Sequence, residues 1–149
     1  MSRSEGAWSG SSKLHLSWLP EDQKIQESEG ELTISIDPKS SYAVISYTWI
    51  YEGETQFGTM LVAGDIEAGT GSIGWSDSWH QSSGVMYLTG SFSETSITCL
   101  GKYGGDGDEA YGWRIAFSLD TDDRFLVEMT NIEPNGNEEW AVKAVYSRA

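Results

Sequence analysis

Two tryptophans, a carboxylate and an imidazole fall within seven residues, in the segment 74–80 that reads Gly-Trp-Ser-Asp-Ser-Trp-His. Trp75 and Trp79 could give a small ligand apolar area, while Asp77 and His80 could orient it through hydrogen bonds. The same carboxylate and imidazole could instead act as general acid and base on a bound substrate. A structural role competes with both, because aspartate at a strand end readily accepts hydrogen bonds from turn amides.

Strand geometry decides which of these side chains meet. In a regular strand, Trp75, Asp77 and Trp79 would share one face. If that face points inward, aromatic surroundings would desolvate Asp77 and raise its pKa unless a cation or hydrogen bonds compensate, and such a carboxylate could be a ligand anchor or a general base. His80 falls where the strand gives way to a turn, so we expect its ring to lie over the mouth of any cavity, where it could move a proton.

Three residues outside the segment complete the candidate site. We expect Trp49 and Trp113 to form walls of the same cavity. Arg114 lies on the strand face opposite Trp113, where it could pair with Glu128 of the adjacent strand or bind a ligand carboxylate. The two histidines and the single cysteine show no metal-ligand spacing, so we expect neither a metal site nor a cofactor.

Alternating apolar and polar residues place these side chains on β-strands. The segments with this alternation are 13–18, 32–36, 42–51, 55–63, 72–79, 85–91, 95–102, 111–119, 125–132 and 139–148. Short turns make neighbours in sequence pair antiparallel, and closure removes the unpaired edges of so long a meander. The sequence therefore predicts an all-β fold, an antiparallel up-and-down barrel of about ten strands with a cavity inside. The acidic stretch 20–31 is predicted to be irregular, either a surface loop or a lid.

Composition bounds the class of protein. With 149 residues, the chain is most simply one domain, 1–149. Its 23 acidic and 9 basic residues give a net charge of −14, which argues against nucleic-acid and membrane-surface partners. Cys99 has no second cysteine to pair with, and no apolar run approaches the roughly 20 residues that span a bilayer. We expect a cytoplasmic protein.

Gly6 and Trp8 resemble the Gly-x-Trp signature that opens the first strand of lipocalin-like, or calycin, barrels. In those families the tryptophan closes one end of the barrel, and an arginine of the last strand often covers it. Arg148 ends the last predicted strand here. The resemblance implies a cation–π contact between Arg148 and Trp8.

A broader resemblance spans most of the chain. Its motifs are 75–80, Val85-Met86, Gly90, 112–114, Asn131-Ile132, Pro134, Gly136, Glu138 and 146–148. They resemble a family of uncharacterised bacterial lipocalin-like barrels, a domain of unknown function, which implies a fold and no activity. Nitrobindin is a more distant likeness; it binds haem through a histidine late in its chain, whereas no histidine follows His80 here.

The leading hypothesis is a non-enzymatic protein that binds a small, partly apolar molecule inside the barrel. The residues expected to contact it are Trp49, Trp75, Trp79 and Trp113 as walls, with Asp77, His80 and Arg114 as polar contacts. One alternative is an enzyme that uses Asp77 and His80 as general acid and base in that cavity. Another is an interaction module that forms a homodimer through an outer sheet face, which a contiguous exposed aromatic patch would support.

Overall fold

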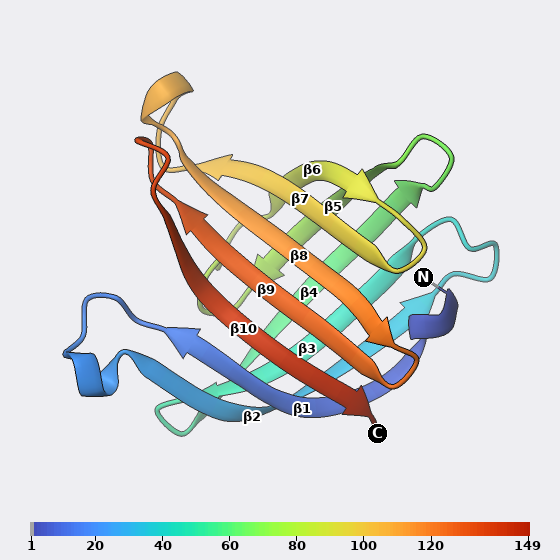
Figure 1. Ribbon diagram of the computed structural model, residues 1–149, viewed down its shortest axis with the longest axis horizontal. Coiled ribbons are helices and arrows are strands. Elements are labelled where there is room, and N and C mark those ends of the chain that lie inside the picture. Colours follow the sequence, from blue (N-terminus) through green and yellow to red (C-terminus); the bar gives the residue numbers. More distant parts are fainter. Residues whose placement is uncertain (1) are drawn as a thin grey trace.

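Ten strands form one closed barrel in the computed structural model, which describes residues 2–149 (Figure 1). The strands are β1 (Gly6–His15), β2 (Ile25–Ile36), β3 (Ala43–Tyr51), β4 (Glu54–Asp65), β5 (Thr70–Asp77), β6 (Met86–Phe92), β7 (Ser96–Tyr103), β8 (Tyr111–Thr121), β9 (Arg124–Ile132) and β10 (Glu138–Arg148). Each strand pairs antiparallel with its neighbours in sequence, and β1 pairs with β10 to close the barrel. The predicted all-β, ten-strand, up-and-down barrel is confirmed.

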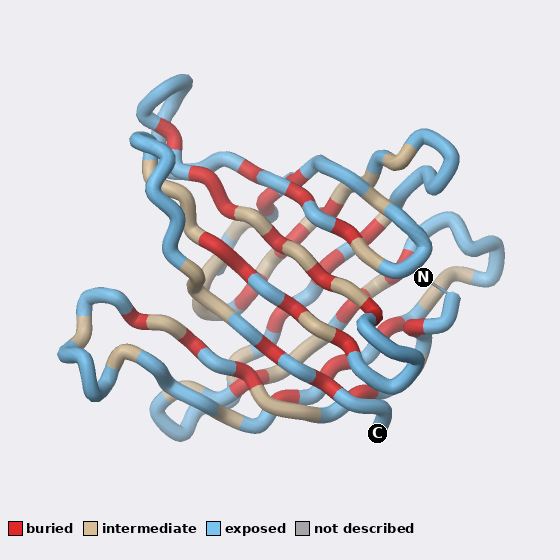
Figure 2. Tube along the Cα trace, in the orientation of Figure 1, coloured by how far each residue is buried: buried red, intermediate tan, exposed pale blue. Residues whose placement is uncertain are grey.

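Burial follows the alternation seen in the sequence. Along most strands, buried positions that point inward alternate with positions in contact with solvent (Figure 2). The largest fully buried side chains are Trp8, Trp75 and Phe125. Most of the barrel interior is therefore core rather than cavity.

The prediction that residues 20–31 are irregular is wrong for residues 25–31. β2 begins at Ile25, and only the connection from 16 to 24, with the short 3-10 helix η2 (Glu21–Gln23), is irregular. The acidic side chains of Glu27, Glu29 and Glu31 occupy the exposed face of β2, where charge is compatible with a strand. β1 also ends at His15, so Trp18 lies in the connection instead of a strand.

Two glycines mark places where neighbouring strands approach closely. A Cβ on Gly10 of β1 would lie 1.9 Å from the carbonyl oxygen of Val145, and one on Gly90 of β6 would lie 2.0 Å from that of Thr98. β1 and β6 lie near the lower and upper edges of the barrel in Figure 1, where β7 to β10 cross in front of β2 to β5. Glycine at such edges lets a sheet turn from one wall to the other.

The end of the barrel that holds both termini is covered by the chain itself, and we call it the closed end. Trp8 is 1% exposed, and its indole Nε1 donates a hydrogen bond of 2.9 Å to the carbonyl oxygen of Ser4. The guanidinium of Arg148 lies 4.4 Å from the centre of the Trp8 ring and donates to the carbonyl oxygens of Glu5 and Asp122. The cation–π contact implied by the resemblance is confirmed.

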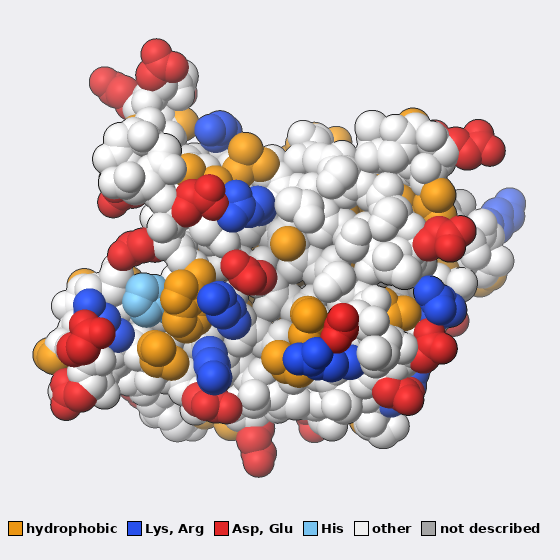
Figure 3. Space-filling view, in the orientation of Figure 1, with side chains coloured by type: hydrophobic (Ala, Val, Ile, Leu, Met, Phe, Trp, Pro, Cys, Tyr) orange, Lys and Arg blue, Asp and Glu red, His pale blue; other side chains and the backbone are white. Residues whose placement is uncertain are grey.

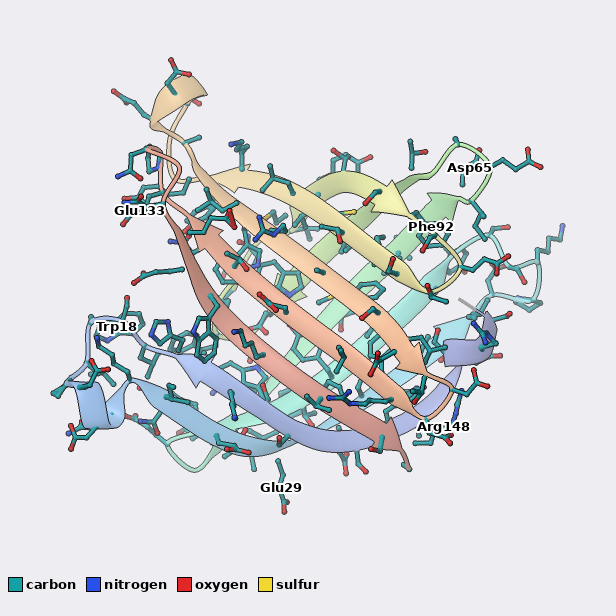
Figure 4. The ribbon with its side chains drawn as sticks, in the orientation of Figure 1. Trp18, Glu29, Asp65, Phe92, Glu133 and Arg148 are labelled. Atoms are coloured by element: carbon teal, nitrogen blue, oxygen red, sulfur yellow. The ribbon has the colours of Figure 1, made fainter. Side chains whose placement is uncertain are left out.

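The opposite end, which we call the open end, is formed by the connections after β1, β3, β5, β7 and β9. Figure 4 shows Trp18 and Glu133 at this end, far from Arg148. The candidate segment 74–80 runs into it, because β5 stops at Asp77. The open end is therefore where the predicted site residues meet.

Candidate functional site at the open end

Asp77 organises the turn that follows β5. Its side chain points inward, and the residue is 3% exposed. Oδ1 accepts hydrogen bonds from the backbone N–H groups of Trp79 (2.7 Å) and His80 (2.8 Å), while Oδ2 accepts one from the Tyr47 hydroxyl (2.7 Å). The carboxylate thus fixes the backbone that carries Trp79 and His80.

The pKa of Asp77 is lowered rather than raised, because hydrogen bonds that compensate for burial are present. Burial alone would raise this pKa, but the His80 imidazole, the Tyr47 hydroxyl and the His80 backbone N–H outweigh it and hold it below its ordinary value. The carboxylate is therefore ionised at neutral pH, with both oxygens engaged. Such a group anchors structure well and is poorly suited to remove a proton from a substrate.

Tyr47 reaches Asp77 across a glycine. Tyr47 of β3, Gly58 of β4 and Asp77 of β5 are neighbours in one row of the sheet. A Cβ on Gly58 would fall 2.0 Å from Tyr47 Cζ, so the missing side chain is what lets the ring lie across β4. Burial and the Asp77 charge raise the pKa of Tyr47 well above its ordinary value, so its hydroxyl stays protonated and donates.

The hydroxyl of Tyr47 also accepts a hydrogen bond of 2.9 Å from Trp75 Nε1. Sequence reasoning did not include Tyr47 in the site. The available signal was its place on the apolar face of 42–51, next to Trp49. What the sequence could not show is the register that sets Tyr47 opposite Gly58.

The His80 ring is enclosed without a hydrogen-bond partner. Its side chain is 8% exposed and packs against three indoles, with centroid separations of 4.7 Å to Trp79, 5.4 Å to Trp49 and 5.6 Å to Trp113. Nδ1 lies 3.6 Å from Asp77 Oδ1, which is too long for a hydrogen bond. Within residues 2–149, His80 Nδ1, His80 Nε2 and Trp113 Nε1 are the buried side-chain polar atoms that lack a partner.

The ring of His80 separates two spaces. The outer space, which we call the mouth, holds about 200 Å³. Its lining is His15, Ser17, Trp18, Trp79, His80, Tyr103, Trp113, Asn131, Glu139, Trp140 and Ala141. Figure 3 shows hydrophobic side chains gathered beside a histidine at this end of the molecule.

The inner space is narrow. Its gaps total about 500 Å³, but the centre of a water molecule can occupy only about 20 Å³ of them, enough for roughly one or two waters. Trp49, Asp77 and His80 line it together with Tyr47 and apolar core residues. The interior therefore has less free volume than the strand count predicts, and the room for a ligand lies mainly at the mouth.

The structure brings together most of the predicted site residues. Trp49, Asp77 and His80 line the inner space, and Trp79 and Trp113 join His80 at the mouth. Trp75 lines neither space, since it is fully buried and stacks on Trp113 at a centroid separation of 5.4 Å.

Arg114 lies outside both spaces. Trp113 points inward on β8, so the side chain of Arg114 projects from the outer face. Its guanidinium forms an ion pair with Glu138 at the start of β10. The predicted pairing with Glu128 is wrong, because Glu128 stands opposite Ala116 on β8 and Lys143 on β10.

Among the residues of the mouth that were not predicted, four carry aromatic rings: His15, Trp18, Tyr103 and Trp140. The rings of His15 and Trp140 stack at a centroid separation of 4.7 Å, and Nδ1 of His15 lies 2.8 Å from the Trp140 carbonyl oxygen. These residues come from the end of β1, the end of β7 and the start of β10, or from the connection after β1. Their meeting depends on closure of the barrel, which brings distant strand ends together.

A broader hollow of about 780 Å³ lies at the closed end, between the connections after β2 and β4. No buried polar atom lacks a partner among its lining residues, which is why we place the candidate site at the open end. In the described part of the chain, no three His, Cys, Asp or Glu side chains are grouped so that they could hold a metal ion. None of the helices in residues 2–149 has the length and apolar character needed to cross a membrane.

Comparison with known proteins agrees with this fold and leaves the activity open. Fourteen chains of solved structures match, among them the crystal structure of Rv2717c from M. tuberculosis. That structure superposes with a TM-score of 0.66 and 12% sequence identity, covering 99% of this chain and 94% of the other, a likeness that concerns fold alone. No curated protein matches. The family described as "Protein of unknown function (DUF1579)" matches residues 1–148, and the chain belongs to that family.

Proposed function

We propose that this protein binds a small, partly apolar molecule at the open end of the barrel, with the indoles of the mouth around its apolar part and His80 in contact with its polar part. The observation that carries the proposal is the set of three buried atoms without partners: both ring nitrogens of His80 and Nε1 of Trp113. Each such atom costs about 1–3 kcal/mol when left unpaired. A bound molecule that supplies the partners recovers part of this cost.

Binding without chemistry is the version that the geometry supports. The Asp77 carboxylate is occupied by the Tyr47 hydroxyl and two backbone N–H groups. Cys99 is buried, and desolvation raises its pKa to about 11, which disfavours a thiolate nucleophile. The alternative enzyme could not use Asp77 as its base and would have to rely on His80 with other titratable residues of the mouth, such as His15 and Glu139.

Native mass spectrometry of freshly purified protein tests the proposal. We expect a population with added mass that disappears on denaturation, and we expect His80→Phe to lose most of it. Arg114→Met is the matched control, because Arg114 lies outside both spaces and should leave the added mass unchanged. If His80→Phe kept the same added mass, the proposed site would be contradicted. The proposal would also be contradicted if the wild type carried no added mass after purification and gained none when small molecules were added.

A second candidate function, homodimer formation, is favoured by one surface. Leu61, Gly74 and Tyr87 form a row across the outer faces of β4, β5 and β6, and Tyr87 is 69% exposed. Phe57 and Val85 extend this apolar face. No charged residue falls within 55–63, 72–76 or 85–91, although the chain carries a net charge of −14, so two copies could meet here without repulsion.

Light scattering during size-exclusion chromatography tests this second function. We expect a dimer mass for the wild type and a monomer mass for Tyr87→Glu, because the added carboxylate would be buried unpaired. Lys102→Glu, also on an outer strand face, is the control for added charge alone. A monomeric wild type at the highest soluble concentration would exclude the dimer.

A further inference from the structure

We infer that the polar head of the bound molecule is a neutral hydroxyl, so that the protein selects a small alcohol over a carboxylate or an amine of the same skeleton. The inference rests on the proposed binding function and names its ligand class. It follows from the charges that line the two spaces and from the hydrogen-bonding capacity of the three unpartnered atoms.

The lining charges disfavour an anion. No lysine or arginine lines the mouth or the inner space. Their formally charged side chains are Asp77 inside and Glu139 at the mouth, in a chain of net charge −14. A carboxylate head would be placed beside two like charges without a cation to pair with, and buried unpaired charge is costly.

The hydrogen-bonding capacity selects among the remaining heads. Nδ1 of His80 faces the Asp77 carboxylate at 3.6 Å, so in the neutral ring the tautomer with its proton on Nδ1 is favoured and Nε2 is left as an acceptor. Nε1 of Trp113 can only donate. The missing partner must therefore donate one hydrogen bond and accept another.

A hydroxyl meets this requirement, because one oxygen carries both an O–H donor and acceptor lone pairs. An ammonium donates only, and an ether or a carboxylate accepts only, so each of them leaves one buried atom unpaired. The His80 and Trp113 rings lie 5.6 Å apart between centroids, so both border the same part of the mouth. The rings are in contact, so the head group would be bound at their shared edge facing the mouth rather than between them.

The size of the mouth limits the rest of the molecule. About 200 Å³ is below the range of drug-sized pockets, and its walls are largely aromatic. Trp79 and Trp113 offer ring faces and edges, and the side chain of Trp18 stands outside them. The complementary molecule is an alcohol with a single ring or a short chain.

Four probes with one skeleton test the inference: 2-phenylethanol, its methyl ether, 2-phenylethylamine and phenylacetate. Binding is followed by NMR of the ¹⁵N-labelled protein, with the Trp113 indole N–H resonance as the local reporter. We expect the alcohol to bind about tenfold more tightly than the ether, which corresponds to one hydrogen bond. The amine should bind more weakly than the alcohol, and the carboxylate most weakly.

His80→Phe separates recognition from packing. Phenylalanine keeps an aromatic ring against the three indoles but removes the acceptor, so the preference for alcohol over ether should disappear. The variant should unfold at a denaturant concentration close to that of the wild type, because the removal of two unpaired nitrogens offsets the loss of the imidazole beside Asp77. Trp113→Phe is the second variant and should lose the preference by removing the donor, whereas Arg114→Met should keep it.

The outcomes distinguish the head group from the site. Equal binding of alcohol and ether, or tightest binding of the amine or the carboxylate at the mouth, would overturn the hydroxyl assignment and leave the proposed binding function in place. If no probe moves the Trp113 resonance, the assignment is overturned, and the adduct in native mass spectrometry decides the proposed function separately.

Discussion

The two ends of the barrel use the same kind of side chain in opposite ways. At the closed end, the Trp8 indole donates to the Ser4 carbonyl oxygen, and Arg148 covers its ring while donating to backbone carbonyls. At the open end, Nε1 of Trp113 and both nitrogens of His80 are buried without a partner. The Trp8 indole N–H has a hydrogen-bond partner within the chain, whereas the Trp113 indole N–H has none.

This difference indicates how the two ends divide stability and recognition. A tryptophan with all its polar atoms satisfied adds apolar burial at no cost, so it stabilises the fold. The unpaired polar atoms of His80 and Trp113 lower the stability of the fold, and a complementary group that paired with them would recover part of that loss. The following substitutions test that division, with the largest expected effect first.

Trp8→Ala should destabilise the barrel by about 3–5 kcal/mol, because it leaves a cavity in a fully buried site and removes the surface on which Arg148 lies. Trp18→Ala is the matched change at the open end, where the residue is 68% exposed, and should change stability by less than about 0.5 kcal/mol. Urea denaturation followed by circular dichroism measures both. Similar losses for the two variants would erase the distinction between the ends.

Arg148→Met should cost about 2 kcal/mol, since it removes the cation–π contact and the hydrogen bonds to the carbonyl oxygens of Glu5 and Asp122. Arg114→Met removes only the exposed pair with Glu138 and should have almost no effect. Denaturation midpoints of the two variants provide the comparison. An equal cost at both positions would mean that Arg148 acts as an ordinary surface charge.

Gly58→Ala should destabilise the open end by about 1–2 kcal/mol, because the new Cβ meets the Tyr47 ring and breaks its hydrogen bond to Asp77. Gly74→Ala is the control: a Cβ there has Val85 Cγ1 at 3.8 Å as its nearest atom, an ordinary contact. Thermal unfolding and the upfield aromatic NMR signals report both variants. A neutral Gly58→Ala would show that Tyr47 does not depend on that glycine.

Asp77→Asn should change how stability depends on acid. Because the pKa of Asp77 is lowered in the folded protein, its ionisation stabilises the fold fully above its ordinary value of 3.8 and ceases to do so as the pH falls through the lowered value. The wild type should therefore exceed the variant at neutral pH, and the difference should shrink below about pH 4. Unfolding free energies measured from pH 2 to pH 7 show this directly.

Asp37→Asn provides the matched measurement at the closed end, where hydrogen bonds from the backbone of Tyr42 and Lys39 lower the pKa of an exposed carboxyl. Water screens that carboxylate, so the corresponding difference should be smaller. If the difference in unfolding free energy between the wild type and Asp77→Asn were constant over the whole pH range, the charge of Asp77 would not contribute to stability.

Much of the barrel could be predicted because its strands alternate clearly. The run 42–51, with Ile45 and Trp49 on its inner face, coincides with β3 almost to the residue. The first half of β2 was harder to predict, because the acidic residues Glu27, Glu29 and Glu31 are typical of a loop. In the structure they occupy the solvent-exposed face of the strand. Composition alone cannot separate a polar outer face from an irregular segment.

The site was predictable within the segment 74–80 and for Trp49 and Trp113, whose large aromatic side chains indicated walls. Asp77 and His80 could be placed together because only two residues lie between them. Tyr47, Trp140 and the missing partner of Trp113 depend on register and closure, which no local pattern encodes. Arg114 was ambiguous for the same reason, since its face is fixed only once Trp113 is known to point inward.

Gly10 and Gly90 have a consequence for how the barrel can diverge. Each lies where the carbonyl oxygen of the adjacent strand occupies the place of a side chain, so neither position accepts an added carbon without moving the backbone. They lie in β1 and β6, and between them stand two walls of four strands, β2 to β5 and β7 to β10. Substitutions can therefore change the lining of one wall while the close strand contacts at Gly10 and Gly90 keep the circumference of the barrel constant.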